Sequence, residues 1–136
     1  MALKYAPNIG TILLCDFGGT IAPEINKKRP VVFLANNSAR LCTVVPLSTT
    51  APDHIRPWHY PLRTQEPLPS PYDSEYHWAK CDMIFVASFE RLSLPCNGRD
   101  ATGRRRYVIK CLTSDELEAI RLCVVRAIAP SLVLDK

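Results

Sequence analysis

The chain has 136 residues, of which 47% are hydrophobic and 22% charged, and its formal net charge is +4. These values argue against whole-chain disorder, and the length suits one domain, residues 1–136, with a core that needs no metal or disulfide to hold it. No apolar run approaches the roughly 18 residues of a membrane span, and the first residues lack a signal-peptide pattern. We therefore expect a cytoplasmic domain with no membrane partner.

Six cysteines raise the question of disulfides or metal. Four lie inside apolar runs: Cys15, Cys42, Cys111 and Cys123. Apolar surroundings and the absence of an export signal favour reduced, buried thiols. The residues that approach a metal-binding set are His54, His59, His77 and Cys81. Their spacing fits no familiar zinc pattern, so we expect neither a metal nor another cofactor.

Positive charge is concentrated in two places. The segment 99–110 carries one acid and five basic residues: Arg99, Arg104, Arg105, Arg106 and Lys110. A second cluster is Lys27-Lys28-Arg29. Two basic clusters on a neutral body indicate a surface for a polyanion such as RNA. Two solvated loops would give the same pattern, and charge alone does not separate these interpretations.

Three short apolar runs predict strands in the first third of the chain. They are residues 11–17, 31–35 and 41–45. The run 31–35 is too continuously apolar for a strand with one wet face, so we expect it to be buried on both sides. Strands in such close succession favour a meander or a small barrel over a parallel unit with crossover helices.

The middle of the chain has a different composition. Six of the twelve prolines lie between Pro52 and Pro71, and aromatic residues gather in and after this stretch. Because proline cannot donate to a strand ladder, we expect residues 51–77 to form a Pro-rich excursion with at most a short strand at 58–62.

Regular structure is expected again after this excursion. Residues 78–87 predict one strand, on which Lys80 and Asp82 would share a face. Residues 105–112 predict a further strand. Thr113 and Glu116 fit a capping box, followed by apolar residues at helical spacing, so residues 113–129 predict a C-terminal helix.

Three groups of side chains carry candidate chemistry. Arg29 begins a buried strand, where its planar guanidinium suits a phosphate, although it could equally cover a sheet edge. Ser48 and Thr49 follow another strand and would either bind phosphate oxygens or cap a turn. Lys80 and Asp82 would divide acid and base roles, or form an exposed ion pair.

These features occur together in one family. Pro7-x-x-Gly10, an apolar strand ending Asp16-Phe17, Thr20 and Glu24, Lys28-Arg29-Pro30-Val31-Val32, and Val45-Pro46-Leu47-Ser48-Thr49 follow one another in the first fifty residues. In this order they resemble the MazF/PemK-type toxins, the ribonuclease halves of bacterial toxin–antitoxin pairs. Lys80-Cys81-Asp82 is similar to a later family segment, R-C-D.

The resemblance implies an SH3-like small β-barrel with a C-terminal helix, acting as a homodimer and neutralised by a cognate antitoxin. It implies a metal-independent endoribonuclease that cleaves single-stranded mRNA at short motifs. The 2′-hydroxyl attacks its own phosphate, leaving a 2′,3′-cyclic phosphate and a 5′-hydroxyl.

The same resemblance assigns roles to individual residues. Arg29 would be the phosphate clamp and acid, and Asp82 the base. Ser48 takes the place of a family Thr that helps bind the phosphate, and Thr49 substitutes if the register shifts by one. Lys80 stands where some members have an Arg acid. RNA would also contact the basic clusters, through Lys27, Lys28, Arg104, Arg105 and Arg106.

Two other functions remain open at this point. A related toxin of the same architecture blocks DNA gyrase by contact, without cutting, and the chain could act in that way. The third interpretation is an SH3-like interaction module. In the RNA-cleaving case, Trp58 and Tyr60 are available for base stacking, or pack in the core instead.

Overall fold

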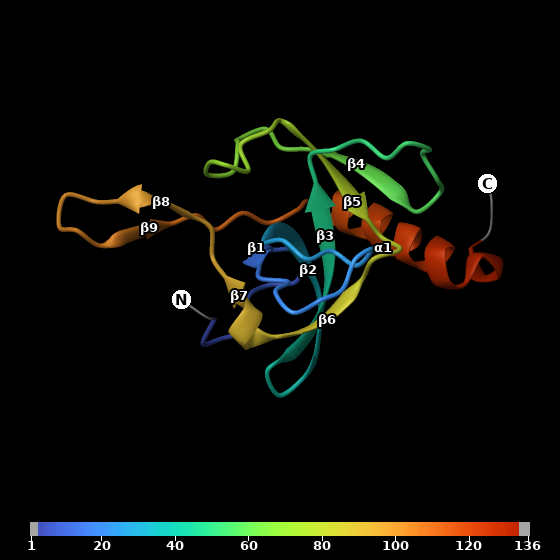
Figure 1. Ribbon diagram of the computed structural model, residues 1–136, viewed down its shortest axis with the longest axis horizontal. Helices are drawn as coiled ribbons and strands as arrows, with labels where there is room; N and C mark the ends of the chain where they lie inside the picture. Colours follow the sequence, from blue (N-terminus) through green and yellow to red (C-terminus); the bar gives the residue numbers. More distant parts are fainter. Residues whose placement is uncertain (1–2, 134–136) are drawn as a thin grey trace.

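The structure, a computed structural model, describes residues 3–133 (Figure 1). The nine strands are β1 (Ile12–Cys15), β2 (Arg29–Ser38), β3 (Leu41–Ser48), β4 (His59–Arg63), β5 (Tyr76–Lys80), β6 (Phe85–Ser88), β7 (Leu92–Ser93), β8 (Cys96–Arg99) and β9 (Arg105–Tyr107). The helix α1 spans Ser114–Ile128, and 3-10 turns lie at Phe89–Arg91 and Pro130–Leu132. No helix in the described range has the length and apolar character to cross a membrane.

Seven strands form one antiparallel sheet. Six of them follow the order β4-β5-β3-β2-β1-β7, and the seventh, β6, pairs with β3. β8 and β9 make a separate hairpin that projects from the body (Figure 1). The mainly β class with a C-terminal helix is thereby confirmed. Within residues 3–133 the strand order does not return on itself, so the sheet is not closed into a barrel.

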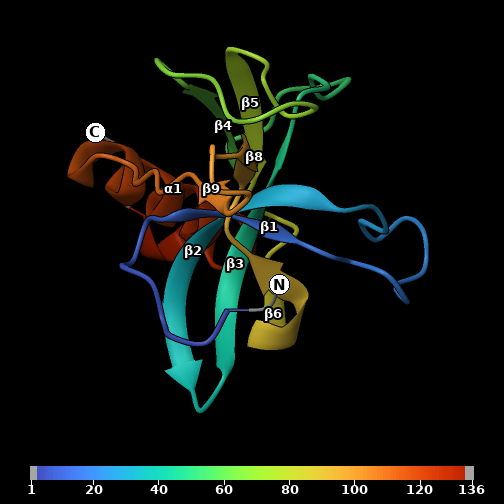
Figure 2. The same cartoon turned by 90° about the vertical axis from the view of Figure 1, so that its left-hand side faces the viewer.

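The strand β2 is the centre of the core. Val31, Val32 and Phe33 have no exposed surface, as the continuous apolar run predicts. Val32 packs in the cluster that includes Ile120 of the helix, whereas Val31 and Phe33 pack in a second cluster on the opposite face. Figure 2 shows this arrangement, with α1 on one side of the sheet and the loop 16–28 on the other.

The helix begins where the sequence predicts. The Thr113 hydroxyl accepts a hydrogen bond from the Glu116 amide (3.2 Å), and the Glu116 carboxylate accepts one from the Thr113 amide (2.9 Å). This capping box satisfies two of the amides that a helix start leaves without partners. Ile120, Cys123 and Val124 then form the buried stripe that holds α1 against the sheet.

The prediction of one strand over residues 78–87 is wrong. The chain forms β5 and β6, joined by a turn in which the Met83 amide donates to the Lys80 carbonyl (3.0 Å). The cause is the partner strand, because β3 pairs with Ala79 through Leu47 and with Phe85 through Val44. Two residues of β3 therefore lie opposite the five residues 80–84. Lys80 therefore ends a strand while Asp82 lies in the turn, and the two do not share a strand face.

Two further expectations need correction. Of residues 105–112 only Arg105–Tyr107 is a strand, and the rest runs beside the start of β1, with the Ile12 amide donating to the Lys110 carbonyl (2.8 Å). This segment lies at the surface, which leaves the Cys111 thiol exposed. Cys81, in a more polar sequence context, is buried instead. All six cysteines are free thiols.

The excursion contains the short strand that was expected near 58–62, found as β4. Its end contains His77, a side chain only 1% exposed, whose ring nitrogens have no hydrogen-bond partner among the described residues. Burial lowers the pKa of His77, and the neighbouring backbone of Ser74 and Tyr72 offsets part of that effect. Burial of this kind favours the neutral form of the imidazole.

This leads to a prediction about acid stability. The pKa of His77 in the folded protein lies below the unfolded value of about 6.5, so the unfolded chain takes up a proton first as pH falls. His77 therefore does not lower the free energy of unfolding above that pH and lowers it increasingly below. The full loss is about 1.4 kcal/mol for each pKa unit between the two states. We expect His77→Leu to reduce the drop in the free energy of unfolding between pH 7.5 and 5.5, measured by urea denaturation. His54→Leu, which replaces an exposed histidine, is the matched control. Equal drops in wild type and His77→Leu would contradict the assignment.

Candidate nucleic-acid interface

Arg29 and Ser48 emerge from neighbouring strand ends. Arg29 is the first residue of β2, half-buried and paired with Cys15. The β2–β3 register pairs Val31 with Pro46, and its continuation places Arg29 opposite Ser48. Side chains alternate along a strand, so Arg29 shares the face of Val31, and directly opposed residues of an antiparallel pair share one face. The two side chains therefore leave the same face of the sheet, away from α1.

The Ser48 hydroxyl has a local role in the structure. Its oxygen accepts a hydrogen bond from the Thr50 amide (3.2 Å), which is the turn-capping alternative from the sequence. A hydroxyl that accepts in this way keeps its own proton for donation to a further acceptor. Ser48 pairs with Trp78 and ends β3, whereas Thr49 lies beyond the strand and is exposed. Ser48 is thus the hydroxyl in register with Arg29.

Lys80 lies on the same face as Ser48. Ser48 opposes Trp78, and Lys80 follows Trp78 by two residues on β5, so the three side chains share a face. On the next strand, β4, His59 opposes Lys80 and extends that face. The ends of β2, β3, β5 and β4 therefore present, in that order, a guanidinium, a hydroxyl, an ammonium group and an imidazole.

His59 is the member of this face that sequence reasoning did not find, having considered it only as a metal ligand. Its Nδ1 accepts a hydrogen bond from the Arg56 amide (3.0 Å), which leaves the hydrogen of the neutral ring on Nε2. Partial burial lowers the pKa of His59, and the nearby Lys80 lowers it further, while Asp82 raises it. The pairing of β4 with β5 would have been the signal, but prolines hide the strand period there.

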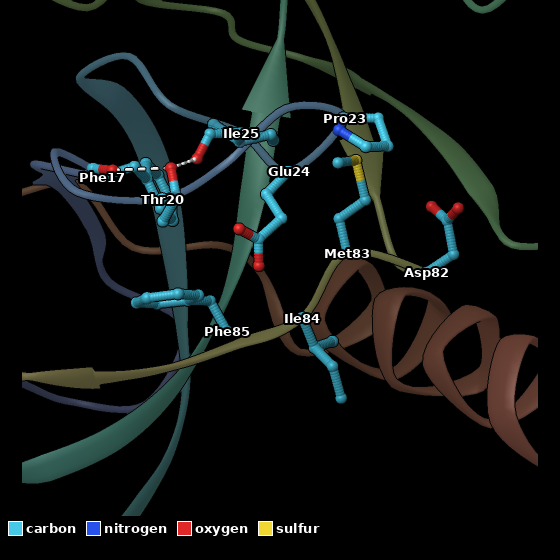
Figure 3. A pocket seen from close by; sticks show the side chains of 9 residues that line it. All are labelled: Phe17, Thr20, Pro23, Glu24, Ile25, Asp82, Met83, Ile84 and Phe85. Atoms are coloured by element: carbon cyan, nitrogen blue, oxygen red, sulfur yellow. Dashed lines mark hydrogen bonds between the residues drawn. The ribbon is translucent and has the colours of Figure 1, made fainter.

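Asp82 belongs to a neighbouring cavity of about 290 Å³ under the loop that joins β1 to β2. Figure 3 shows Asp82 and Met83 on the segment between β5 and β6, and Pro23 and Glu24 on the loop that faces this segment. The Thr20 hydroxyl lies within hydrogen-bonding distance of the Phe17 and Ile25 carbonyls, at 2.8 and 2.6 Å, and so holds the loop. The cavity thus carries two carboxylates next to the basic face.

The remaining basic residues lie on two segments. Lys27 and Lys28 are exposed at the end of the loop before β2. Arg104, Arg105 and Arg106 are exposed on the β8–β9 hairpin, where Arg106 donates to the Asn97 carbonyl (3.3 Å). Within residues 3–133, no group of three His, Cys, Asp or Glu side chains is arranged to hold a metal ion.

The pKa of His59 offers a direct test of this geometry. Lys80→Met removes a positive charge that disfavours the imidazolium, so the pKa of His59 should rise; Asp82→Asn removes a negative charge, so the pKa should fall. Shifts of a few tenths of a unit are resolved by following the His59 ring protons in NMR spectra between pH 4.5 and 8. Replacement of the distant Arg121 by Met is the control and should shift nothing. Shifts of the same sign for both variants would contradict the arrangement.

Comparison with known proteins extends this description. Residues 8–128 match the PemK-like, MazF-like toxins of type II toxin–antitoxin systems. The chain is 30% identical to the uncharacterized protein YifN of Escherichia coli (strain K12), over 94% of this chain and 95% of that protein. It is also 30% identical, over the whole of both chains, to an uncharacterized protein of Haemophilus influenzae (strain KW20 Rd).

Solved structures agree on the fold. An endoribonuclease in complex with its cognate antitoxin, from a mycobacterial species, superposes with a TM-score of 0.61 at 19% identity, covering 96% of this chain and 100% of that one. The Mycobacterium tuberculosis toxin MazF-mt6 gives 0.54 at 17% identity, covering 85% and 93%. With the fold and the family match in agreement, the chain belongs to the PemK-like, MazF-like toxin family of type II toxin–antitoxin systems.

Proposed function

We propose that this toxin is a sequence-selective, metal-independent endoribonuclease that cleaves single-stranded mRNA. Family membership supports the class of activity, and solved structures with the same fold include an endoribonuclease bound to its antitoxin. The observation that carries the proposal is the placement of Arg29 and Ser48 at register-matched ends of β2 and β3, on one face of the sheet. A guanidinium and a hydroxyl so placed can bind two oxygens of one phosphate.

The proposed chemistry uses four side chains. The ribose 2′-oxygen attacks the phosphorus, its proton passes to Asp82, and the P–O5′ bond breaks to leave a 2′,3′-cyclic phosphate and a 5′-hydroxyl. Arg29 stabilises the charge that develops on the phosphate and supplies the proton to the leaving oxygen, while Ser48 donates to a second phosphate oxygen. Lys80 adds a point charge beside Ser48, where it draws the phosphate toward this face.

The substrate would be held mainly through its backbone. Thr49 and the basic loop residues Lys27 and Lys28 flank the proposed centre, and Arg104, Arg105 and Arg106 extend the positive surface along the hairpin. Such contacts to phosphates give affinity without sequence preference, and selectivity requires contacts to unstacked bases. Trp58 and Tyr60 are partly buried against the core cluster, which leaves little of either ring for stacking.

We also propose that the protein works as a cytoplasmic homodimer neutralised by a cognate antitoxin. The support for an antitoxin is the family and the related complex. The support for a second copy is the strand β6. In the described part of the chain it pairs only with β3, so its outer edge has no partner strand, and its Val86 is 60% exposed. Apolar surface on an unpaired edge is stabilised when another chain covers it.

The central prediction concerns Arg29. In EDTA, the purified protein should cleave a mixed-sequence single-stranded RNA, and Arg29→Ala should lower the rate constant about a hundredfold or more, because one charge-stabilising donor is lost. Arg29→Lys should recover part of the rate, since the charge returns without the planar fork. Single-turnover gels with end-group analysis measure both, and Arg121→Gln on the exposed face of α1 is the control.

Intact RNA with every sequence tested would contradict the proposal. Inhibition of DNA gyrase by both wild type and Arg29→Ala would then establish the non-cleaving toxin, and unaffected cell growth on overexpression would favour the SH3-like interaction module. If Arg29→Ala cleaved RNA as fast as the wild type, the protein would be a ribonuclease, but the active centre proposed around Arg29 would be wrong.

A further inference from the structure

A cavity of about 270 Å³ joins the two basic clusters that are far apart in the sequence. One wall carries Lys28, from the loop before β2, and another carries Arg105 and Tyr107, from β9 at the base of the hairpin. The excursion supplies the third wall, with Ser70 and Tyr72. Beneath it lie Leu14 of β1, Ser93 of β7 and Leu94, which follows β7. The cavity is therefore built from five separate parts of the chain and carries polar and aromatic groups over an apolar base.

The charges in this cavity have no acidic partners. Within residues 3–133 the ion pairs are Arg40–Glu90 and Arg63–Glu75, and neither involves Lys28 or Arg105. No Asp or Glu side chain lines the cavity. Asp100, the acid of the hairpin, accepts hydrogen bonds from Thr102 and the Arg104 amide at the hairpin tip. Two cations facing one concave space attract an anion strongly, because like charges concentrate the field there.

Backbone and side-chain contacts fix the walls in place. The Tyr72 hydroxyl donates to the Lys28 carbonyl (3.1 Å) and so ties the excursion to the loop before β2. Tyr107 pairs with Cys96 across the hairpin, and the Val108 amide donates to the Pro95 carbonyl (2.8 Å) at its base. A site formed by anchored segments needs little ordering when a ligand enters, which favours binding.

We propose that this cavity binds one nucleotide of the single-stranded RNA, beside the nucleotides at the cleaved bond. The phosphate lies between Lys28 and Arg105, and the base lies against Tyr107, a residue that is 41% exposed. This proposal rests on the proposed ribonuclease function. Lys28 immediately precedes Arg29, and successive residues of an extended chain point to opposite sides, so the RNA crosses the end of β2 between the clamp and the cavity.

The chemistry of the walls selects a nucleotide over other anions. Inorganic phosphate would use the two cations and leave the tyrosines without contacts. An aromatic ring next to paired cations matches a base next to its phosphate, and such stacking tolerates any base. The volume of the cavity, about 270 Å³, lies just below the usual range of ligand pockets, which suits one nucleotide and is too small for a base-paired RNA helix.

The test uses the full-length protein and a 12-nucleotide RNA with 2′-O-methyl groups, which lacks the attacking hydroxyl and stays intact. We expect Lys28→Gln/Arg105→Gln to weaken binding about tenfold at low salt and to reduce the slope of log affinity against log salt by about 0.7 for each lost phosphate contact. Tyr107→Leu should weaken binding of the intact RNA but leave the salt slope, and should have no effect on an RNA with abasic linkers throughout. Lys4→Gln/Arg121→Gln removes the same charge elsewhere and is the matched control.

The outcomes separate this proposal from the ribonuclease activity. Equal loss of affinity and equal slope in the cavity and control variants would overturn the cavity as a subsite, even where the wild type cleaves RNA. If the Lys28→Gln/Arg105→Gln variant lost as much affinity for inorganic phosphate as for the oligonucleotide, and Tyr107→Leu lost none for either, the cavity would be a simple anion site. That result would overturn the nucleotide assignment. Weakened binding as expected, in a protein that leaves unmodified RNA uncut, would support the cavity and refute the proposed cleavage.

Discussion

Val31, Val32 and Phe33 are enclosed on both faces of the sheet, between the helix cluster and the cluster under the β1–β2 loop. A slip by one residue would put Phe33 on the face where Val32 packs, and the close packing of both clusters opposes this exchange. The pairing of β2 with β3 is therefore fixed, and it determines where both strands end. Arg29 and Ser48 occupy those ends, so the position of the candidate site follows from the packing of residues that touch no substrate.

Local sequence pattern predicted the parts of the fold that depend on local chemistry. The apolar run at 31–35 and the capping box at Thr113 each carry their cause within a few residues. The division of 78–87 into β5 and β6 does not, because it follows from β3 having two partners at different registers. Burial of the Cys81 thiol and exposure of Cys111 have the same origin, since the path of the surrounding chain sets both.

The candidate site shows a similar division. Arg29, Ser48, Lys80 and Asp82 were candidates from their positions on the predicted strands, and resemblance to a toxin family assigned their roles. Their relation in space, with Lys80 on the strand face and Asp82 in a turn above a neighbouring cavity, required the structure. His59 was missed as a member of this face because its strand begins within a proline-rich segment. The encounter of Lys28 with Arg105 also depends on long-range packing, although each basic cluster was evident in the sequence.

The central claim is that Arg29 and Ser48 act on the same phosphate, and a double-mutant cycle tests it most directly. Rate constants for RNA cleavage would be measured for wild type, Arg29→Ala, Ser48→Ala and the double variant under single-turnover conditions. Groups that act as a unit lose less together than the product of their separate losses. The account predicts a double variant about as slow as Arg29→Ala alone. Losses that multiply in full would show that the two side chains act independently and would contradict it.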